Sequence, residues 1–102
     1  MSRLDQLRKL AELEPQDPLA HYGVGLECLN LERWDEAAAA FAKAIEVDAG
    51  YSAAYYHKAR AEIGAGRMPA AQETLTAGIV VAQRKGDMKT EGEMRELLES
   101  IA

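Results

Sequence analysis

The side chains with the widest chemical range in this chain are its two histidines, its single cysteine and an isolated Glu62. His21 and His57 fall in neighbouring predicted helices but not at equivalent places, and no cysteine or carboxylate spacing completes a metal site. Cys28 is predicted to face the helix-packing side as a small buried hydrophobe. Gly64-Ala65-Gly66 is predicted to be a turn rather than a nucleotide loop, because no strand precedes it. We therefore predict no enzyme activity, cofactor or metal.

The remaining polar candidates point to contacts rather than to chemistry. His57 lies three residues before Arg60. It is either an ordinary exposed histidine or a group that recognises an acidic partner or titrates near neutral pH. Glu62 is predicted to pair with Lys58 one turn earlier, or with Arg67 across the following turn. The alternative for Glu62 is an acidic contact to a partner.

Composition and charge narrow the class of protein. The 102 residues suit one domain, and a hydrophobic fraction of 48% with only 6% aromatics favours close-packed helices. The net charge of -5 disfavours nucleic acid and anionic membrane surfaces as partners. One cysteine allows no internal disulfide, and the N-terminus has no apolar run of signal-peptide type. We expect a cytoplasmic protein.

The clearest local pattern runs from Trp34 to Asp48 and predicts a helix. Its small and apolar side chains step by three and four residues, which places them on one helix face. The same pattern recurs 34 residues later. The matching pairs are Ala37 with Ala71, Phe41 with Leu75, Ala44 with Gly78, Ile45 with Ile79, Tyr22 with Tyr56 and Gly25 with Ala59. Such self-similarity is typical of a stacked helical repeat.

Capping and breaking residues predict the other helices. Ser2 with Asp5 resembles a capping box, Asp17 is a predicted N-cap, Ser52 is predicted to cap a later helix, and Gly50 is predicted to end the Trp34 helix. The predicted helices cover residues 2–14, 18–30, 34–48, 52–63, 69–85 and 88–101. The short connections between them imply antiparallel neighbours.

The period and its residue types resemble the tetratricopeptide repeat. The matching positions are Val24-Gly25, Ala37, Phe41 and Ala44 in the first repeat, and Tyr55, Ala59, Ala71 and Leu75 in the second. The chain departs from the family pattern at the closing proline and at aromatic positions, where it has Ala49, Gln83, His21, Cys28 and Glu62.

The resemblance implies an all-α antiparallel helix-pair solenoid of about six helices. Residues 1–102 would form a small stand-alone domain. Its parts would be a half repeat at 2–14, full repeats at 18–51 and 52–85, and a capping helix at 87–101. In this family the first helix of each pair lines a concave groove. Carried over residue by residue, the groove would hold Leu19, Tyr22, Leu26, Leu29, Asn30, Tyr56, His57, Arg60, Ile63 and Gly64, with Thr90 and Met94 from the last helix.

The implied function is a non-catalytic adaptor that binds a peptide or amphipathic helix of a partner protein in an apolar groove. Two alternatives remain open. The apolar stripe of the first groove helix is either exposed for a partner or covered by the chain's own terminal helices. The alternative to an adaptor is a self-assembling structural protein whose helices pair in a homodimer. Capture of a C-terminal carboxylate is disfavoured, because the groove offers only Arg60, Asn30 and His57.

Overall fold

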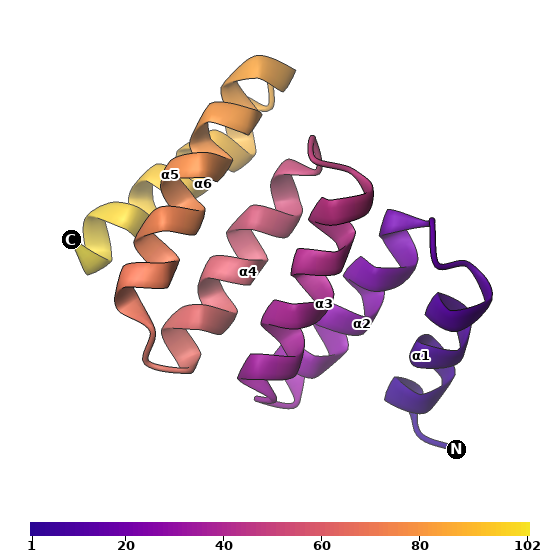
Figure 1. Ribbon diagram of the computed structural model, residues 1–102. Helices are drawn as coiled ribbons and strands as arrows, with labels where there is room; N and C mark the ends of the chain where they lie inside the picture. Colours follow the sequence, from indigo (N-terminus) through magenta and orange to yellow (C-terminus); the bar gives the residue numbers. More distant parts are fainter.

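The computed structural model describes residues 1–102 as six α-helices without strands (Figure 1). The helices are α1 (Arg3–Leu13), α2 (Pro18–Asn30), α3 (Trp34–Val47), α4 (Ser52–Gly64), α5 (Met68–Lys85) and α6 (Met88–Ile101). The all-α solenoid expected from the repeated pattern is confirmed. None of the six helices has the length and apolar character needed to cross a membrane.

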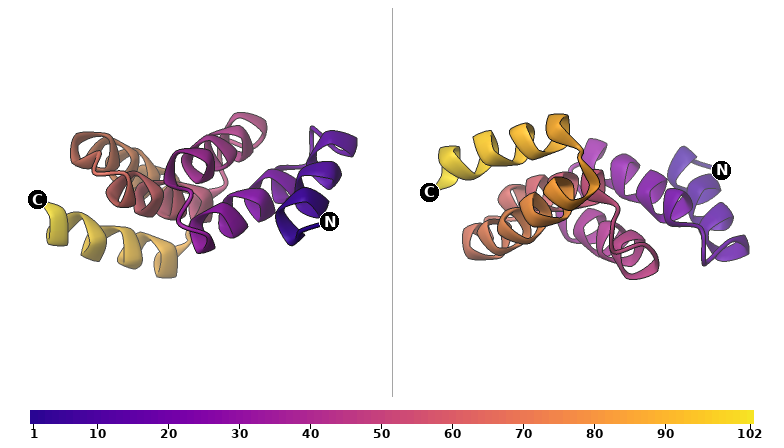
Figure 2. Two further views of the ribbon diagram at one scale, coloured as in Figure 1. Left: turned by 90° about the horizontal axis from the view of Figure 1, so that it is seen from below. Right: turned by 90° about the horizontal axis from the view of Figure 1, so that it is seen from above.

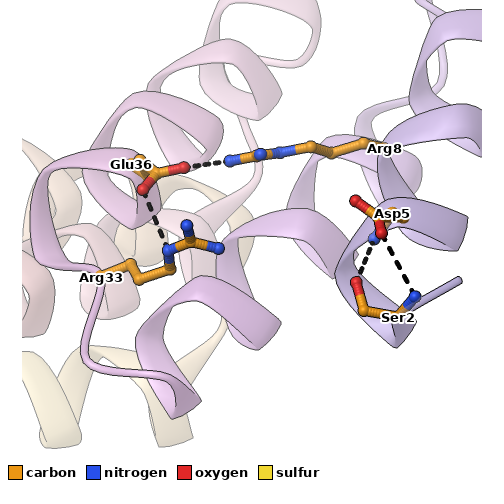
Figure 3. A network of polar contacts seen from close by, with 5 residues as sticks. All are labelled: Ser2, Asp5, Arg8, Arg33 and Glu36. Carbon is orange, nitrogen blue, oxygen red and sulfur yellow. Dashed lines mark hydrogen bonds and ion pairs between the residues drawn. The ribbon is translucent and has the colours of Figure 1, made fainter.

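Side-chain caps begin three of the helices. Ser2 and Asp5 form the predicted capping box of α1 (Figure 3), and the Asp17 carboxylate accepts from the Leu19 N–H at 2.9 Å at the start of α2. The prediction that Ser52 caps α4 is wrong. Ser52 is the first residue inside α4, and its hydroxyl donates to the Asp87 carboxylate at 2.6 Å. This bond joins the start of α4 to the N-cap of α6, and it lowers the pKa of Asp87.

The core consists of two clusters, in which Ala37 and Phe41 of the first are equivalent to Ala71 and Leu75 of the second. The first surrounds Phe41 and Cys28, and the second surrounds Leu75 and Met94; all four side chains are fully buried. Burial confirms the prediction that Cys28 is a packed hydrophobe, and it raises the pKa of the thiol. Large residues at the same point of each repeat thus fill the space between helix pairs.

The stack curves because its two sides pack differently. Each helix contacts the next one along the chain. Among helices further apart in sequence, only α2 with α4 and α4 with α6 come close along their backbones. The even-numbered helices therefore lie nearer to each other than the odd-numbered ones, so they form the inner side of the curve. We call this side the inner face and the side of α1, α3 and α5 the outer face. The terminal helices lie at opposite ends of the stack (Figures 1 and 2).

The last two helices depart from the 34-residue period. α3 ends at Val47, before Gly50, whereas its repeat partner α5 continues to Lys85 and ends at Gly86 in the left-handed conformation. A strict period would begin α6 at residue 86, but α6 begins at Met88. The longer α5 therefore displaces α6 relative to the pattern set by α2 and α4. This displacement changes which side of α6 faces its neighbours.

Candidate inner-face binding site

The apolar stripe predicted on α2 is partly open to solvent. Leu19 is 63% exposed and Leu26 is 37% exposed, while Leu29 is half-buried. The opposite side of α2 packs into the core, where a Cβ added at Gly25 would lie 2.5 Å from Phe41 Cε1. The backbones of α2 and α6 do not come close to each other. Of the two interpretations of this stripe, the structure thus supports exposure at Leu19 and Leu26.

Aromatic rings join α2 to α4 on the inner face. Tyr22 stacks on Tyr51 with ring centroids 4.8 Å apart, and it meets the ring of His57 edge-on at 5.6 Å. His57 also stacks near Phe41 at 5.8 Å and meets Tyr56 at 5.1 Å. We call these five residues the aromatic cluster. Such ring pairs stabilise beyond the area that they bury, so the cluster holds the two helices at a fixed distance.

Burial determines the charge state of His57. The ring is partly shielded from water, and this burial, helped by the nearby Arg60 guanidinium, lowers its pKa to about 4. Arg60 can only donate, so its Nη1 donates to His57 Nδ1 at 3.2 Å and fixes a neutral ring with Nδ1 as acceptor. The prediction of an ordinary exposed histidine is therefore wrong, because the ring is half-buried, and so is the alternative that His57 titrates near neutral pH.

Charged groups border the aromatic cluster. The Arg60 guanidinium lies 5.9 Å from the centroid of the Tyr56 ring, which suits a cation–π contact. Burial raises the pKa of Tyr22, with opposing effects from Arg60 and from Glu93 of α6. Burial also raises the pKa of Tyr51 to about 12. The hydroxyls of both tyrosines are therefore neutral, and Arg60 is the cation that acts on Tyr22.

The predicted contribution of α6 is wrong. Met94 is fully buried against α5, where Gly78 leaves room for its sulfur, and Thr90 is also buried. The displacement of α6 described above turns these two side chains into the core. Glu93 of α6 is instead close enough to Tyr22 to contribute to raising the pKa of that tyrosine.

The remaining predicted residues lie at the margins. Asn30 and Arg60 are exposed, and Ile63 packs beside the second core cluster with Tyr56. Tyr51, Phe41 and Glu93 were missed by sequence reasoning. No period-based signal marks Tyr51, because Lys85 occupies the equivalent position one repeat later. Of the residues predicted for the groove, only Gly64 lines one of the main hollows of the surface, so most of the inner face is an open surface.

Comparisons with known proteins agree with this architecture. The sequence pattern described as "Tetratricopeptide repeat" matches residues 29–86. The TPR2B domain of yeast Sti1, in its complex with pHsp70, superposes with a TM-score of 0.90 at 24% identity, covering 96% of this chain and 78% of that one. A Bordetella parapertussis protein, BPP2914, gives 0.84 at 21% identity over 99% of this chain and 88% of that one. A comparison with curated protein sequences finds no match.

A third solved structure has somewhat higher identity. The tetratricopeptide repeat domain protein from Salinibacter ruber is 29% identical, with a TM-score of 0.77 and coverage of 85% of this chain and 88% of that one. The curved stack with its open inner face defines a helical-repeat protein-interaction module, a class that is generally non-catalytic. The chain belongs to the tetratricopeptide repeat family.

Proposed function

We propose that this protein binds an amphipathic helix or apolar peptide of a partner protein on its inner face. The supporting observation is the exposed pair Leu19 and Leu26 beside the aromatic cluster. Exposed apolar side chains bordered by polar ones are typical of an interface. On this proposal Leu19, Tyr22, Leu26, Leu29 and Asn30 contact the partner from α2.

The residues proposed for α4 have different roles. The residues involved are Tyr56, His57, Arg60 and Ile63. The rings of Tyr56 and His57 would form a rigid floor, and Arg60 would meet a polar or acidic group of the partner. Ile63 would extend the apolar surface toward α6. We further propose that residues 18–51 and 52–85 are the two repeat units that carry this surface.

The yeast Sti1 domain is described in complex with pHsp70, which makes peptide binding a relevant comparison. Capture of a terminal carboxylate needs several converging donors. Here the guanidinium of Arg60 already donates to His57 Nδ1 and lies near the Tyr56 ring. We therefore favour recognition through apolar side chains rather than through a terminal carboxylate.

A capture experiment with exposed-site variants tests the proposal. Leu19→Glu with Leu26→Glu places charge on the inner face without altering a buried side chain. The matched control is Val80→Glu, on the exposed side of α5. We expect specific partners to be lost with the double variant and retained with the control. An unchanged set of partners with the double variant would show that the inner face is not the binding surface.

Self-assembly is the second candidate function, and the exposed apolar side chains of α1 are the observation that favours it. Leu10 is 54% exposed and Leu13 is 69% exposed, and with Met1 they border a mainly apolar hollow of about 340 Å³. On this alternative the α1 helices of two copies would pair through these side chains. Sedimentation over a range of concentrations decides it: dimerisation that Leu10→Lys with Leu13→Lys abolishes supports it, and a concentration-independent monomer excludes it.

A further inference from the structure

A polar network lies inside the outer-face seam between α3, α4 and α5. Lys58 Nζ donates to Glu62 Oε2 at 3.0 Å and to Thr74 Oγ1 at 3.2 Å. The Thr74 hydroxyl donates to Glu62 Oε1 at 2.7 Å, and both Glu62 and Thr74 are buried. The network forms the base of a hollow of about 350 Å³. We call this the second hollow.

An equivalent hollow of about 500 Å³ lies one repeat earlier, between α1, α2 and α3. We call this the first hollow. At the positions 34 residues before Lys58, Glu62 and Thr74, the chain has Val24, Cys28 and Ala40. The same seam therefore packs with apolar residues in one repeat and polar residues in the next. Since a buried ion pair adds little stability over apolar packing, the fold itself does not require the polar network.

The rims of the two hollows also differ, but here the first hollow has the charged residues and the second has the apolar ones. Long charged side chains border the first hollow: Arg8, Glu36 and Lys43. The equivalent positions of the second hollow are all alanine: Ala42, Ala70 and Ala77. Ile45 and the ring of Tyr55 complete the apolar wall. The second hollow thus has a polar base and short side chains around its mouth, which leaves room for an incoming side chain.

The first hollow shows what this space accommodates. There Arg8 reaches from α1 across to the Glu36 carboxylate of α3, and Glu36 also pairs with Arg33 at 3.2 Å (Figure 3). The second hollow has no such cation, because Ala42 replaces Arg8. It instead has Glu73 on its rim, where the first hollow has Ala39, and Glu73 forms no ion pair.

The charges of the second hollow favour a cation. Lys58 and Glu62 compensate each other, and Glu73 leaves one uncompensated negative charge at the mouth. A ligand with an alkyl stem would contact Ala42, Ala70 and Ala77, while its positive head would reach Glu73. The Glu62 carboxylate, at the base of the hollow, can accept a hydrogen bond from a further N–H.

We propose that the second hollow is a binding site for an arginine side chain of a partner protein. The incoming guanidinium takes the place that Arg8 occupies in the first hollow. It pairs with the Glu73 carboxylate and lies over the Lys58–Glu62–Thr74 network. The site lies on the outer face, so it operates separately from the inner face and allows two partners, or two segments of one partner, to bind together.

A nuclear magnetic resonance titration of the whole ¹⁵N-labelled chain tests this proposal. The probe is N-acetyl-arginine methylamide, and its neutral isostere is N-acetyl-citrulline methylamide. We expect saturable shifts at the amides of Ala42, Ala70, Glu73 and Ala77, with a dissociation constant on the order of 10 mM for one side chain. The citrulline probe should bind at least about fivefold more weakly, because it lacks the charge that strengthens a guanidinium–carboxylate bond.

Matched variants separate a built site from general attraction to an acidic protein. Glu73→Gln should weaken arginine binding about fivefold, whereas Glu99→Gln on the exposed side of α6 should not change it. Glu73 is exposed, so its variant does not threaten folding. Equal binding of both probes would overturn the proposal, as would shifts spread over all acidic surfaces or equal losses with the two glutamine variants.

Discussion

Gly25 provides the sharpest steric test at the level of single residues. A methyl group there would lie 2.5 Å from Phe41 Cε1 and 2.7 Å from Cδ1, and a buried ring has little room to move. We expect Gly25→Ala to lower the free energy of unfolding by about 1–3 kcal/mol. Gly92, on the exposed side of α6, has nothing within 4 Å of the added methyl group. Gly92→Ala should therefore stabilise by about 0.5–1 kcal/mol. Urea unfolding measures both changes, and equal effects would contradict this packing.

His57 should make stability depend on pH. Its pKa is about 4 in the folded chain, against 6.5 for an unperturbed histidine, so the unfolded chain binds the proton more readily. The stabilising effect is complete above about pH 6.5 and is lost as pH falls toward 4. Because the ring is only partly shielded, we expect a loss of about 1–2 kcal/mol.

Comparison with His57→Phe isolates this effect from the titration of carboxylates. Chemical unfolding at pH 7.5 and pH 5 should show that the variant loses less stability than the wild type does. The phenylalanine ring preserves the aromatic contacts but has no proton to bind. A parallel pH dependence in both proteins would show that His57 titrates normally.

Residue types alone predicted part of the inner face. The exposed stripe on α2 follows from helical spacing, and Leu19 and Leu26 agree with it. The aromatic cluster around His57 was not predicted, and neither was its member Tyr51, which reaches Tyr22 from the loop before α4. Tyr51 lies outside the helical pattern and its equivalent one repeat later is Lys85, so the sequence pattern contained no signal for this contact.

At the scale of elements, two sets of substitutions in the seam between α4 and α5 should lower stability by different amounts. Glu62→Ala leaves the Lys58 ammonium without its carboxylate in a partly buried site, and we expect a loss of about 2–4 kcal/mol. The triple change Lys58→Val, Glu62→Cys and Thr74→Ala copies the residues that pack the same seam one repeat earlier. It should cost less than Glu62→Ala alone, because no charge remains unpaired.

Thermal unfolding under reducing conditions measures both variants. A triple variant that is less stable than Glu62→Ala would show that the two seams are not equivalent. Circular dichroism of the triple variant checks that its helix content is kept. This result also bears on the arginine site, since the triple variant removes the base of the second hollow while leaving its rim intact.

Helix positions were the most predictable part of the fold. The period, the prolines and the capping residues predicted α2 at residues 18–30, and the structure has Pro18–Asn30. The start of α6 at Met88 was also predicted from Asp87, yet its rotation was not, because the groove positions Thr90 and Met94 were carried over by period. The sequence predicted the end of α5 at Lys85, before Gly86, but the strict 34-residue carry-over of groove positions did not allow for the extra length of α5.

At the scale of the whole molecule, the two ends of the stack are held unequally. α1 contributes only Leu4 as a buried side chain, and its backbone packs on α2 alone. Leu7 and Ala11 pack half-buried against the first core cluster. The ion pairs from Arg3 to Glu27 and from Arg8 to Glu36 involve largely exposed arginines and are weak. In contrast, α4 and α5 share the second core cluster with α6, which covers its end with Met94. A repeat stack held by neighbour contacts can open from its weaker end without unfolding completely.

We therefore expect α1 to open before the rest of the chain. Native-state hydrogen exchange should give opening free energies for the α1 amides at least about 2 kcal/mol below those of α4 and α5. Low concentrations of urea should increase exchange in α4 and α5 more steeply than in α1, because their opening exposes more surface. Arg8→Ala removes the ion pair that ties α1 to α3 and should lower protection in α1 alone. Uniform protection along all six helices would instead show that the stack unfolds as one cooperative unit.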